Sequence, residues 1–216
     1  LGVEISTSSI NRWVHAMADK LYGLYAAQME RVLSASYIQV DETTHPITDR
    51  PGSARKGYIW VVRSVLFPGV FFYYDKGSRS QEVVLKMLKG YQGALQTDGY
   101  AAYSIFEEKK GVLPLGCMAH VRRKFEYALT TTPEAKQALD YIALLYMLEG
   151  NLRAQGADPE QIRKEREEKA YPILQQMEAW MKQMFNSCTP KSPLGKAISY
   201  AFGMWPRISR YCKEGY

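Results

Sequence analysis

The chain contains 216 residues, with 28 Lys and Arg against 22 Asp and Glu and a formal net charge of +6. This length suits one domain with an insertion or two small domains, and the positive charge favours an anionic partner, of which nucleic acid is the leading candidate. No run approaches the roughly 18 consecutive apolar residues of a membrane span, and the first residues lack the pattern of a secretory signal. We therefore expect a cytoplasmic protein without a membrane partner.

The first predicted element is an amphipathic helix from Ser8 to about Leu33. Ser8 and Ser9 supply an N-cap, and large apolar residues recur at helical spacing. The stripe consists of Ile10, Trp13, Val14, Met17, Leu21, Leu24, Tyr25 and Met29. The pattern favours a helix that packs its stripe against a core over the last helix of a helix-turn-helix.

Three strands are predicted next, followed by a helix and a fourth strand. A Pro68-Gly69 turn joins the second and third strands into an antiparallel hairpin. Ser78 and Gln81 form a capping box for the helix, which ends at Gly90. The predicted strands cover residues 37–43, 58–66, 70–74 and 94–98, and a polar, basic loop covers residues 46–56.

A short helix over residues 100–109 then leads to a fifth strand over 112–118, which Pro114 places at an edge of the sheet. The predicted order is three strands, a helix, a strand, a helix and a strand. This order matches a ribonuclease-H-like core, which is an α/β fold with a mixed sheet of about five strands and flanking helices. Helical periodicity follows from His120 onwards. The predicted parts are an N-terminal helical segment (1–34), the core (35–130), a helical insertion (131–190) and a last helical segment (191–216).

Two aspartates follow short apolar runs of the predicted sheet. Side chains alternate along a strand, so Asp41 and Glu42 point to opposite faces. If the first and fourth strands are neighbours, the carboxylates of Asp41 and Asp98 could hold two divalent cations about 4 Å apart for phosphodiester chemistry. Aspartates at strand ends are also common turn formers, so the spacing alone leaves both interpretations open.

Cys117 and His120 form a Cys-x-x-His pair, which is half of a tetrahedral zinc site. No second pair accompanies it, and Cys188 and Cys212 stand alone. We therefore expect no zinc and no disulfide framework, but a structural pair that holds the fifth strand near the next helix.

Basic side chains supply candidate DNA contacts, because Arg and Lys bind phosphates without regard to sequence. The basic residues at the start of the helix after the fifth strand are the best candidates, because they are expected to lie close to the phosphate that is cleaved. The candidates are Arg122, Arg123 and Lys124, followed by Arg50, Arg55, Lys56 and Arg79. The charged run over residues 163–169 mixes both signs and is interpreted as a solvated helix face.

Three separate motifs resemble the transposases of the insertion sequence 66 family. They are Asp41-Glu42-Thr43, the Thr97-Asp98-Gly99-Tyr100 segment with Ala102 and Tyr103, and the run from Gly116 to Phe125. The resemblance extends through most of the chain. It implies a DDE transposase that uses two Asp and one Glu to bind Mg²⁺ or Mn²⁺, with two ions in the complete enzyme. Asp41 and Asp98 match the first two acids.

The resemblance also implies double-stranded DNA partners, at the element ends and the target, a homo-oligomeric active complex and association with the bacterial nucleoid. The family's third acid lies in an Asn-Asn-x-x-Glu-Arg motif that has no match here, and Glu214 lacks its flanking residues. Because the sequence starts at Leu1 without methionine, we expect an excerpt from a longer protein. Because the third acid has no match in it, we expect this excerpt to bind divalent cations weakly and to have little or no strand-transfer activity alone.

Two other functions fit parts of the sequence. The His120-Val121-Arg122-Arg123 run matches a tyrosine recombinase box, and the 16 tyrosines offer nucleophiles, but those enzymes have helical catalytic domains. A non-catalytic DNA-binding or oligomerisation module could keep the fold without needing metal. In that case the aspartates would be dispensable.

Overall fold

The computed structural model describes residues 2, 4–50 and 52–216, with the side chains of residues 49 and 50 left out. The chain forms two compact units, residues 1–93 and 94–216. The first unit contains α1 (Thr7–Leu33), β1 (Tyr37–Arg50), β2 (Ser53–Ser64), β3 (Val70–Tyr73) and α2 (Gln81–Met87). β4 (Gly93–Thr97) begins at the last residue of the first unit and continues into the second. The second unit also contains the 3₁₀ helix η1 (Ala101–Phe106), β5 (Val112–Gly116), α3 (Met118–Leu129), α4 (Ala135–Ala154), α5 (Pro159–Glu165), the π-helix η2 (Arg166–Ala170), α6 (Tyr171–Ser187), α7 (Pro193–Arg210) and the 3₁₀ helix η3 (Tyr211–Lys213).

The five strands form a mixed sheet in the order β3-β2-β1-β4-β5, with helices flanking it. This α/β arrangement is consistent with the predicted ribonuclease-H-like fold, so the predicted fold class is confirmed. β5, which contains Pro114, is an edge strand as expected. Among the described residues, every helix is too short or too polar to span a bilayer.

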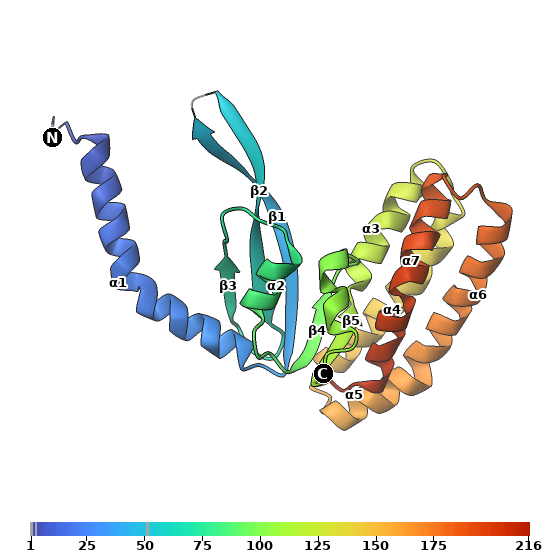
Figure 1. Ribbon diagram of the computed structural model, residues 1–216. Helices are drawn as coiled ribbons and strands as arrows, with labels where there is room; N and C mark the ends of the chain where they lie inside the picture. Colours follow the sequence, from blue (N-terminus) through green and yellow to red (C-terminus); the bar gives the residue numbers. More distant parts are fainter. Residues whose placement is uncertain (1, 3, 51) are drawn as a thin grey trace. The chain divides into compact units, whose positions relative to one another are not determined.

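The first unit is built on an antiparallel meander of β1, β2 and β3. In the register, Val40 lies opposite Val62 and Glu42 lies opposite Trp60, and the apolar side chains of these pairs are buried. α2 lies against these strands (Figure 1) and buries Val83, among others. Trp60 donates its indole N–H to the carbonyl oxygen of Ser78, 3.1 Å away. This bond ties the middle of β2 to the segment before α2.

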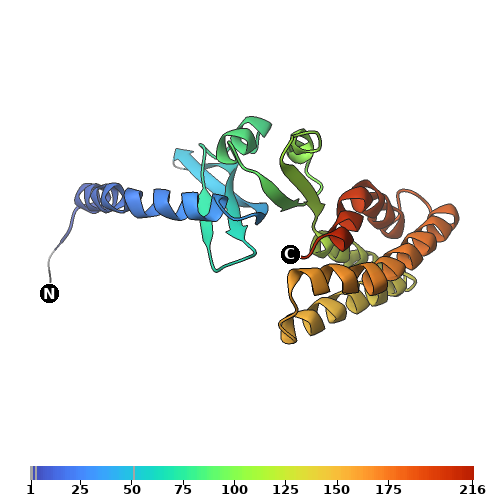
Figure 2. The ribbon, with the colours of Figure 1, turned by 90° about the horizontal axis from the view of Figure 1, so that it is seen from below.

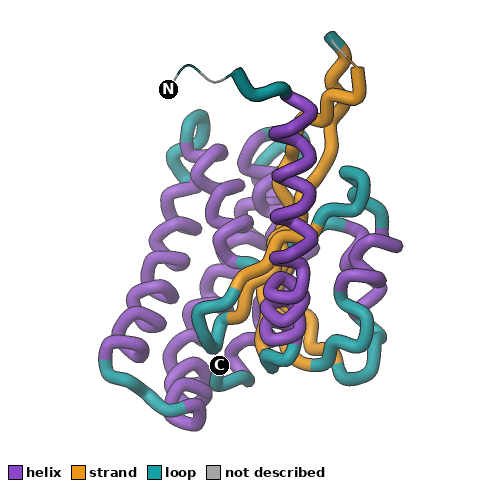
Figure 3. Tube along the Cα trace, turned by 90° about the vertical axis from the view of Figure 1, so that its left-hand side faces the viewer, coloured by secondary structure: helices purple, strands orange, loops and turns teal. Residues whose placement is uncertain are grey.

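The predicted loop over residues 46–56 is wrong, because β1 continues to Arg50 and β2 already begins at Ser53. Figure 3 shows the two strands continuing together as a ribbon. β-branched residues such as Thr43, Thr44 and Ile47 favour extended backbone, and Gly52 adopts the positive φ of 77° that the tight turn requires.

α1 begins with Ser6 as its N-cap, not Ser8, and the Ser6 hydroxyl accepts a hydrogen bond from the Ser9 amide at 3.2 Å. The expectation that its whole apolar stripe packs on a core is wrong. The last turns contact the sheet, where the Tyr25 hydroxyl donates to the Phe72 carbonyl at 2.9 Å and Val32 is fully buried. The preceding turns extend away from the strands (Figure 2).

The predicted capping box at Ser78 is also wrong. α2 begins at Gln81, with Ser80 in the N-cap position and without a side-chain capping bond. Ser78 stays outside the helix because its carbonyl binds Trp60 and its hydroxyl accepts the Ser80 amide at 3.2 Å. The hydrogen bond from Trp60 of β2 therefore holds Ser78 outside the helix, and the capping box predicted from the local sequence does not form.

The second unit packs its helices around one apolar core (Figure 1). Val121 and Phe125 of α3 are fully buried, and so are side chains of α4, α6 and α7, such as Ile142, Met177 and Ile198. The predicted break at residues 156–159 is present, with Asp158 capping α5 through the Gln161 amide at 2.9 Å.

One residue of the charged run over 163–169 is not on a solvated face. Arg166 is 7% exposed and binds both carboxylate oxygens of Glu149 at 2.8 Å. Its guanidinium also donates to the carbonyls of Glu214 at 2.7 Å and Tyr216 at 2.9 Å. The remaining members, such as Arg163 with Glu167, form exposed pairs within the helix, as expected. Arg166 therefore connects α4 to the last residues of the chain.

Replacing Arg166 should destabilise the protein strongly. Arg166→Ala leaves the Glu149 carboxylate and two carbonyls without their donor, at a cost of about 3 kcal/mol in the free energy of unfolding. Arg163→Ala, in the same charged run but exposed, should change stability little. Urea denaturation of both variants measures the difference. Equal stabilities for the two variants would contradict the assigned role.

Candidate active site

Asp41 lies within β1, opposite Val61 in the register, and its side chain is exposed. One of its carboxylate oxygens accepts the backbone N–H of Glu42 at 2.9 Å. The neighbouring side chains Val40 and Glu42 point to the other face of the strand, where both are largely shielded from solvent. The alternation expected for Asp41 and Glu42 is therefore present, and the strand that contains them continues beyond the predicted end at residue 43, to Arg50.

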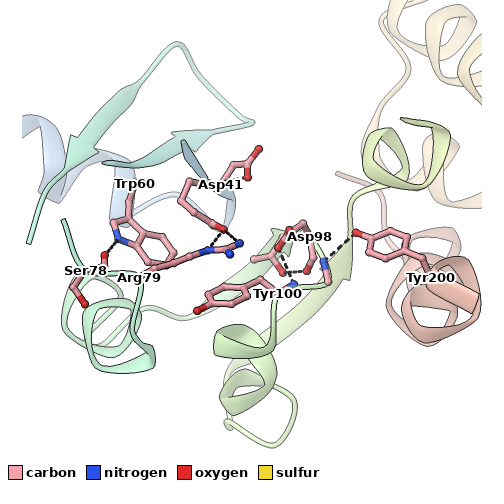
Figure 4. A network of polar contacts seen from close by, with 10 residues as sticks. Asp41, Trp60, Ser78, Arg79, Asp98, Tyr100 and Tyr200 are labelled. Carbon is pink, nitrogen blue, oxygen red and sulfur yellow. Dashed lines mark hydrogen bonds and ion pairs between the residues drawn. The ribbon is translucent and has the colours of Figure 1, made fainter. Parts of the chain in front are cut away.

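Glu42 is held in place by Arg79, which precedes α2. The carboxylate of Glu42 is 3% exposed and accepts the Arg79 Nε–H at 2.8 Å and a second guanidinium N–H. The guanidinium also lies 5.2 Å from the centre of the Tyr58 ring. Figure 4 shows Arg79 directed toward β1, below Trp60. Arg79, a predicted DNA contact, thus has an ion-pair partner within the protein.

Asp98 follows β4 and shapes the loop after it. One carboxylate oxygen of Asp98 accepts the Tyr100 amide at 2.9 Å, and the Asp98 carbonyl accepts the Thr97 hydroxyl at 3.1 Å. The first contact is an Asx turn, which fixes the side chain relative to its own backbone. Asp98 is half-buried, whereas Asp41 is exposed.

Tyr200 of α7 braces the same loop from a distant part of the sequence. Its hydroxyl accepts the Gly99 N–H at 3.2 Å (Figure 4). A Cβ atom on Gly99 would lie 3.0 Å from the Tyr200 ring, so glycine permits this approach. Burial raises the pKa of the Tyr200 hydroxyl, and the nearby Asp98 charge adds to the rise. The hydroxyl therefore stays protonated at neutral pH.

A shallow cavity of about 180 Å³ adjoins this loop. Gly99, Tyr200 and Arg207 line it, together with Ser199, Gly203 and Met204. The Arg207 guanidinium binds the carboxylate of Glu107. α7 thus supplies most of the wall of this cavity, next to Gly99.

Cys117 and His120 lie together at the start of α3. Burial raises the pKa of the Cys117 thiol, but hydrogen bonds from the His120 side chain and from backbone amides outweigh that effect and leave the pKa below its ordinary value. The Cys117 amide donates to the Thr97 carbonyl at 3.0 Å. This bond connects the start of α3 to the end of β4, next to Asp98.

The basic residues proposed from the sequence lie in different settings. Arg122, Arg123 and Lys124 are all exposed on α3. Arg122 pairs with Glu126 at 2.7 Å, and the Lys124 ammonium lies 5.3 Å from the centre of the Tyr200 ring. α3 therefore places the Lys124 ammonium beside Tyr200, the residue that braces the Asp98 loop.

The other basic candidates belong to the first unit. Arg55 and Lys56 are exposed on the β1–β2 ribbon, and the side chain of Arg50 is outside the described part of the chain. The Arg55 guanidinium donates to the Lys76 carbonyl at 3.3 Å, and the Lys56 ammonium lies 5.5 Å from the centre of the Tyr58 ring. DNA contact by these residues stays a prediction.

The donors suit a hard divalent cation, because Asp41 and Asp98 both offer carboxylate oxygens and neither residue is fully buried. In the described part of the chain, no group of three or more His, Cys, Asp or Glu is arranged to hold a metal ion. Asp41 and Asp98 belong to different units, so their convergence stays a prediction. Glu214, near the expected third acid, offers its carbonyl to Arg166.

Sequence reasoning missed the residues that support the two aspartates. Tyr200 carries no local signal, because its partner Gly99 lies 101 residues earlier. Charge alone favours Arg79 as a DNA contact, whereas its pairing with Glu42 depends on the course of the chain between β3 and α2. The position of Glu42 on the buried face of β1 could have indicated a need for a cationic partner.

Removing the Tyr200 hydroxyl should loosen the Asp98 loop. Tyr200→Phe keeps the ring but leaves the Gly99 N–H without its acceptor, which should lower the free energy of unfolding by about 1 kcal/mol and speed hydrogen exchange at Gly99. Tyr127→Phe, at a residue 69% exposed, is the matched control and should change neither quantity. Unchanged exchange at Gly99 in Tyr200→Phe would contradict the bracing role.

Comparison with known proteins identifies relatives along the entire chain. A family model described as "Transposase IS66 family" matches residues 1–216. Two uncharacterized proteins of Sinorhizobium fredii (strain NBRC 101917 / NGR234) are similar to this chain. The first, y4jD, is 28% identical over 231 residues, covering 99% of this chain and 44% of the relative. The second, y4qI, is 30% identical over 233 residues, covering 99% of this chain and 42% of the relative.

The chain therefore spans less than half the length of these curated relatives. The family match, in contrast, extends over the whole sequence and includes both aspartate motifs and the segment from Gly116 to Phe125. The chain belongs to the IS66 family of transposases.

Proposed function

We propose that this chain is part of the catalytic core of a DNA transposase that cleaves phosphodiesters and transfers DNA strands of a bacterial insertion sequence. The observation that carries the proposal is the family match over residues 1–216, which includes the motifs around Asp41 and Asp98. The α/β sheet fold is consistent with that function. Neither the tyrosine recombinase nor the non-catalytic module is favoured by any observation.

Asp41 and Asp98 are proposed as ligands of Mg²⁺ or Mn²⁺. Each carboxylate accepts a backbone amide hydrogen bond through one oxygen, which orients the group before any ion arrives. A bound divalent ion would supply Lewis-acid chemistry, activating the attacking oxygen and stabilising the leaving oxygen. The third acid of the complete enzyme is proposed to come from the rest of the parent protein, so this chain alone should bind cations weakly.

The neighbours of Asp98 have a positioning role in this proposal. The Asx turn to Tyr100 sets the carboxylate, and the Tyr200 hydroxyl holds the next amide. The bond from Cys117 to the Thr97 carbonyl fixes the end of β4 from the other side. In this role these residues act through the backbone of the loop. They restrict the loop so that its carboxylate keeps one orientation.

Double-stranded DNA is the proposed substrate, at the element ends and at the target. The exposed cations Arg122, Arg123 and Lys124 are proposed to contact phosphates, a mode of binding that weakens steeply with salt. Arg55 and Lys56 are additional contacts on the β1–β2 ribbon. The active complex is proposed to be a homo-oligomer that works in the cytoplasm and associates with the nucleoid when bound to DNA.

The catalytic assignment predicts the outcome of conservative substitutions in the full-length protein. Asp41→Asn and Asp98→Asn keep the side-chain volume but lose the charge that holds a cation, so each should lower transposition frequency by about 100-fold or more. Glu108→Gln, at an exposed position in the second unit, is the control and should retain full activity.

The assay is transposition in cells, with protein level and DNA affinity measured in parallel. Normal DNA affinity in the inactive variants would separate catalysis from binding. Wild-type transposition by either aspartate variant would contradict the catalytic role and support a non-catalytic module.

A further inference from the structure

The first turns of α1 present a continuous apolar face that the described part of the chain leaves exposed. Figure 2 shows these turns extending away from the strands of the first unit. The exposed fractions are 46% for Ile10, 61% for Val14, 58% for Met17, 51% for Leu21 and 71% for Leu24. Single exposed apolar residues need no explanation, but a contiguous set on one helix face marks an interaction site.

The spacing of these residues is that of a coiled coil. Ile10, Val14, Met17, Leu21 and Leu24 follow one another at intervals of four and three, so Val14 and Leu21 occupy a positions and Ile10, Met17 and Leu24 occupy d positions of a heptad. A stripe restricted to a and d is narrower than the face of a helix that packs on a globular core. We call these five residues the α1 seam. Its natural partner is another helix with the same repeat.

We propose that the α1 seam binds the α1 seam of a second copy of this chain. No charged side chain occupies an a or d position between Ile10 and Leu24, so two copies can meet without apposing like charges. A symmetric dimer needs a self-complementary patch, and a heptad seam meets that condition. Trp13, 55% exposed beside the seam, adds the kind of large aromatic side chain that anchors interfaces.

The available area agrees with a stable dimer. From their exposed fractions, the α1 seam and Trp13 together offer at most about 700 Å² per copy, which approaches the roughly 800 Å² per partner of a standard interface. The same residues line a shallow groove, formed by Ile10, Trp13, Val14, Met17, Ala18 and Leu21, into which side chains of a second helix can fit. The last turns of α1 remain bound to their own sheet through Tyr25 and Gln28.

Sedimentation equilibrium of the whole chain tests the proposal. The wild-type protein should sediment at twice its monomer mass of 24.7 kDa. Met17→Glu places a charge at a central d position and should weaken dimerisation by at least about 30-fold. Ala16→Glu, one residue earlier, adds the same charge to the outward side of the helix and should leave the dimer intact. Both positions are exposed in the single chain, so neither change should lower the thermal midpoint of the monomer.

Two results would overturn the proposal. A wild-type chain that remains monomeric at high concentration would show that a second copy does not occupy the α1 seam. If the seam were then protected from hydrogen exchange only in the full-length protein, its partner would be another segment of that protein. Equal dimer affinities for Met17→Glu and Ala16→Glu would place the interface elsewhere. The proposal does not depend on Asp41 or Asp98, so these results leave the catalytic assignment untouched.

Discussion

The two-residue alternation of β1 is the constraint on which the first unit depends. Glu42 can be shielded from solvent only because Arg79 neutralises it, and this pair fixes which face of β1 points inward. A slip of one residue would expose Val40 and turn the charged side chain of Asp41 toward the interior. The ion pair therefore keeps Asp41 on the accessible face, where the proposed chemistry needs it.

The second aspartate is controlled by residues far from it in the sequence. The Asp98 loop is braced by Tyr200 from α7 and anchored through Thr97 to the start of α3. α7 itself belongs to the apolar core that α3, α4 and α6 share. The helices after β5 therefore support the Asp98 loop, because their packing positions Tyr200 and the start of α3 against it.

The sequence predicted those features that depend on local pattern. Apolar alternation located the strands, and Pro114 correctly indicated an edge. The same pattern did not predict the β1–β2 ribbon, because a ribbon that is exposed on both faces has no apolar periodicity to detect. Local pattern also did not predict the burial of Arg166, because the partners of Arg166 lie 17 to 50 residues away in the sequence. The exposure of the α1 seam could not be predicted, because amphipathicity does not specify the partner.

The central claim is that Asp41 and Asp98 serve one cation site, and a double-mutant cycle of Mn²⁺ affinity tests it most directly. Calorimetric titration of the chain, of Asp41→Asn, of Asp98→Asn and of the double variant gives the four affinities. If the carboxylates share the site, the double variant should bind little more weakly than the weaker single variant, because either loss disables it. Strictly additive losses, or single variants with unchanged affinity, would contradict the claim.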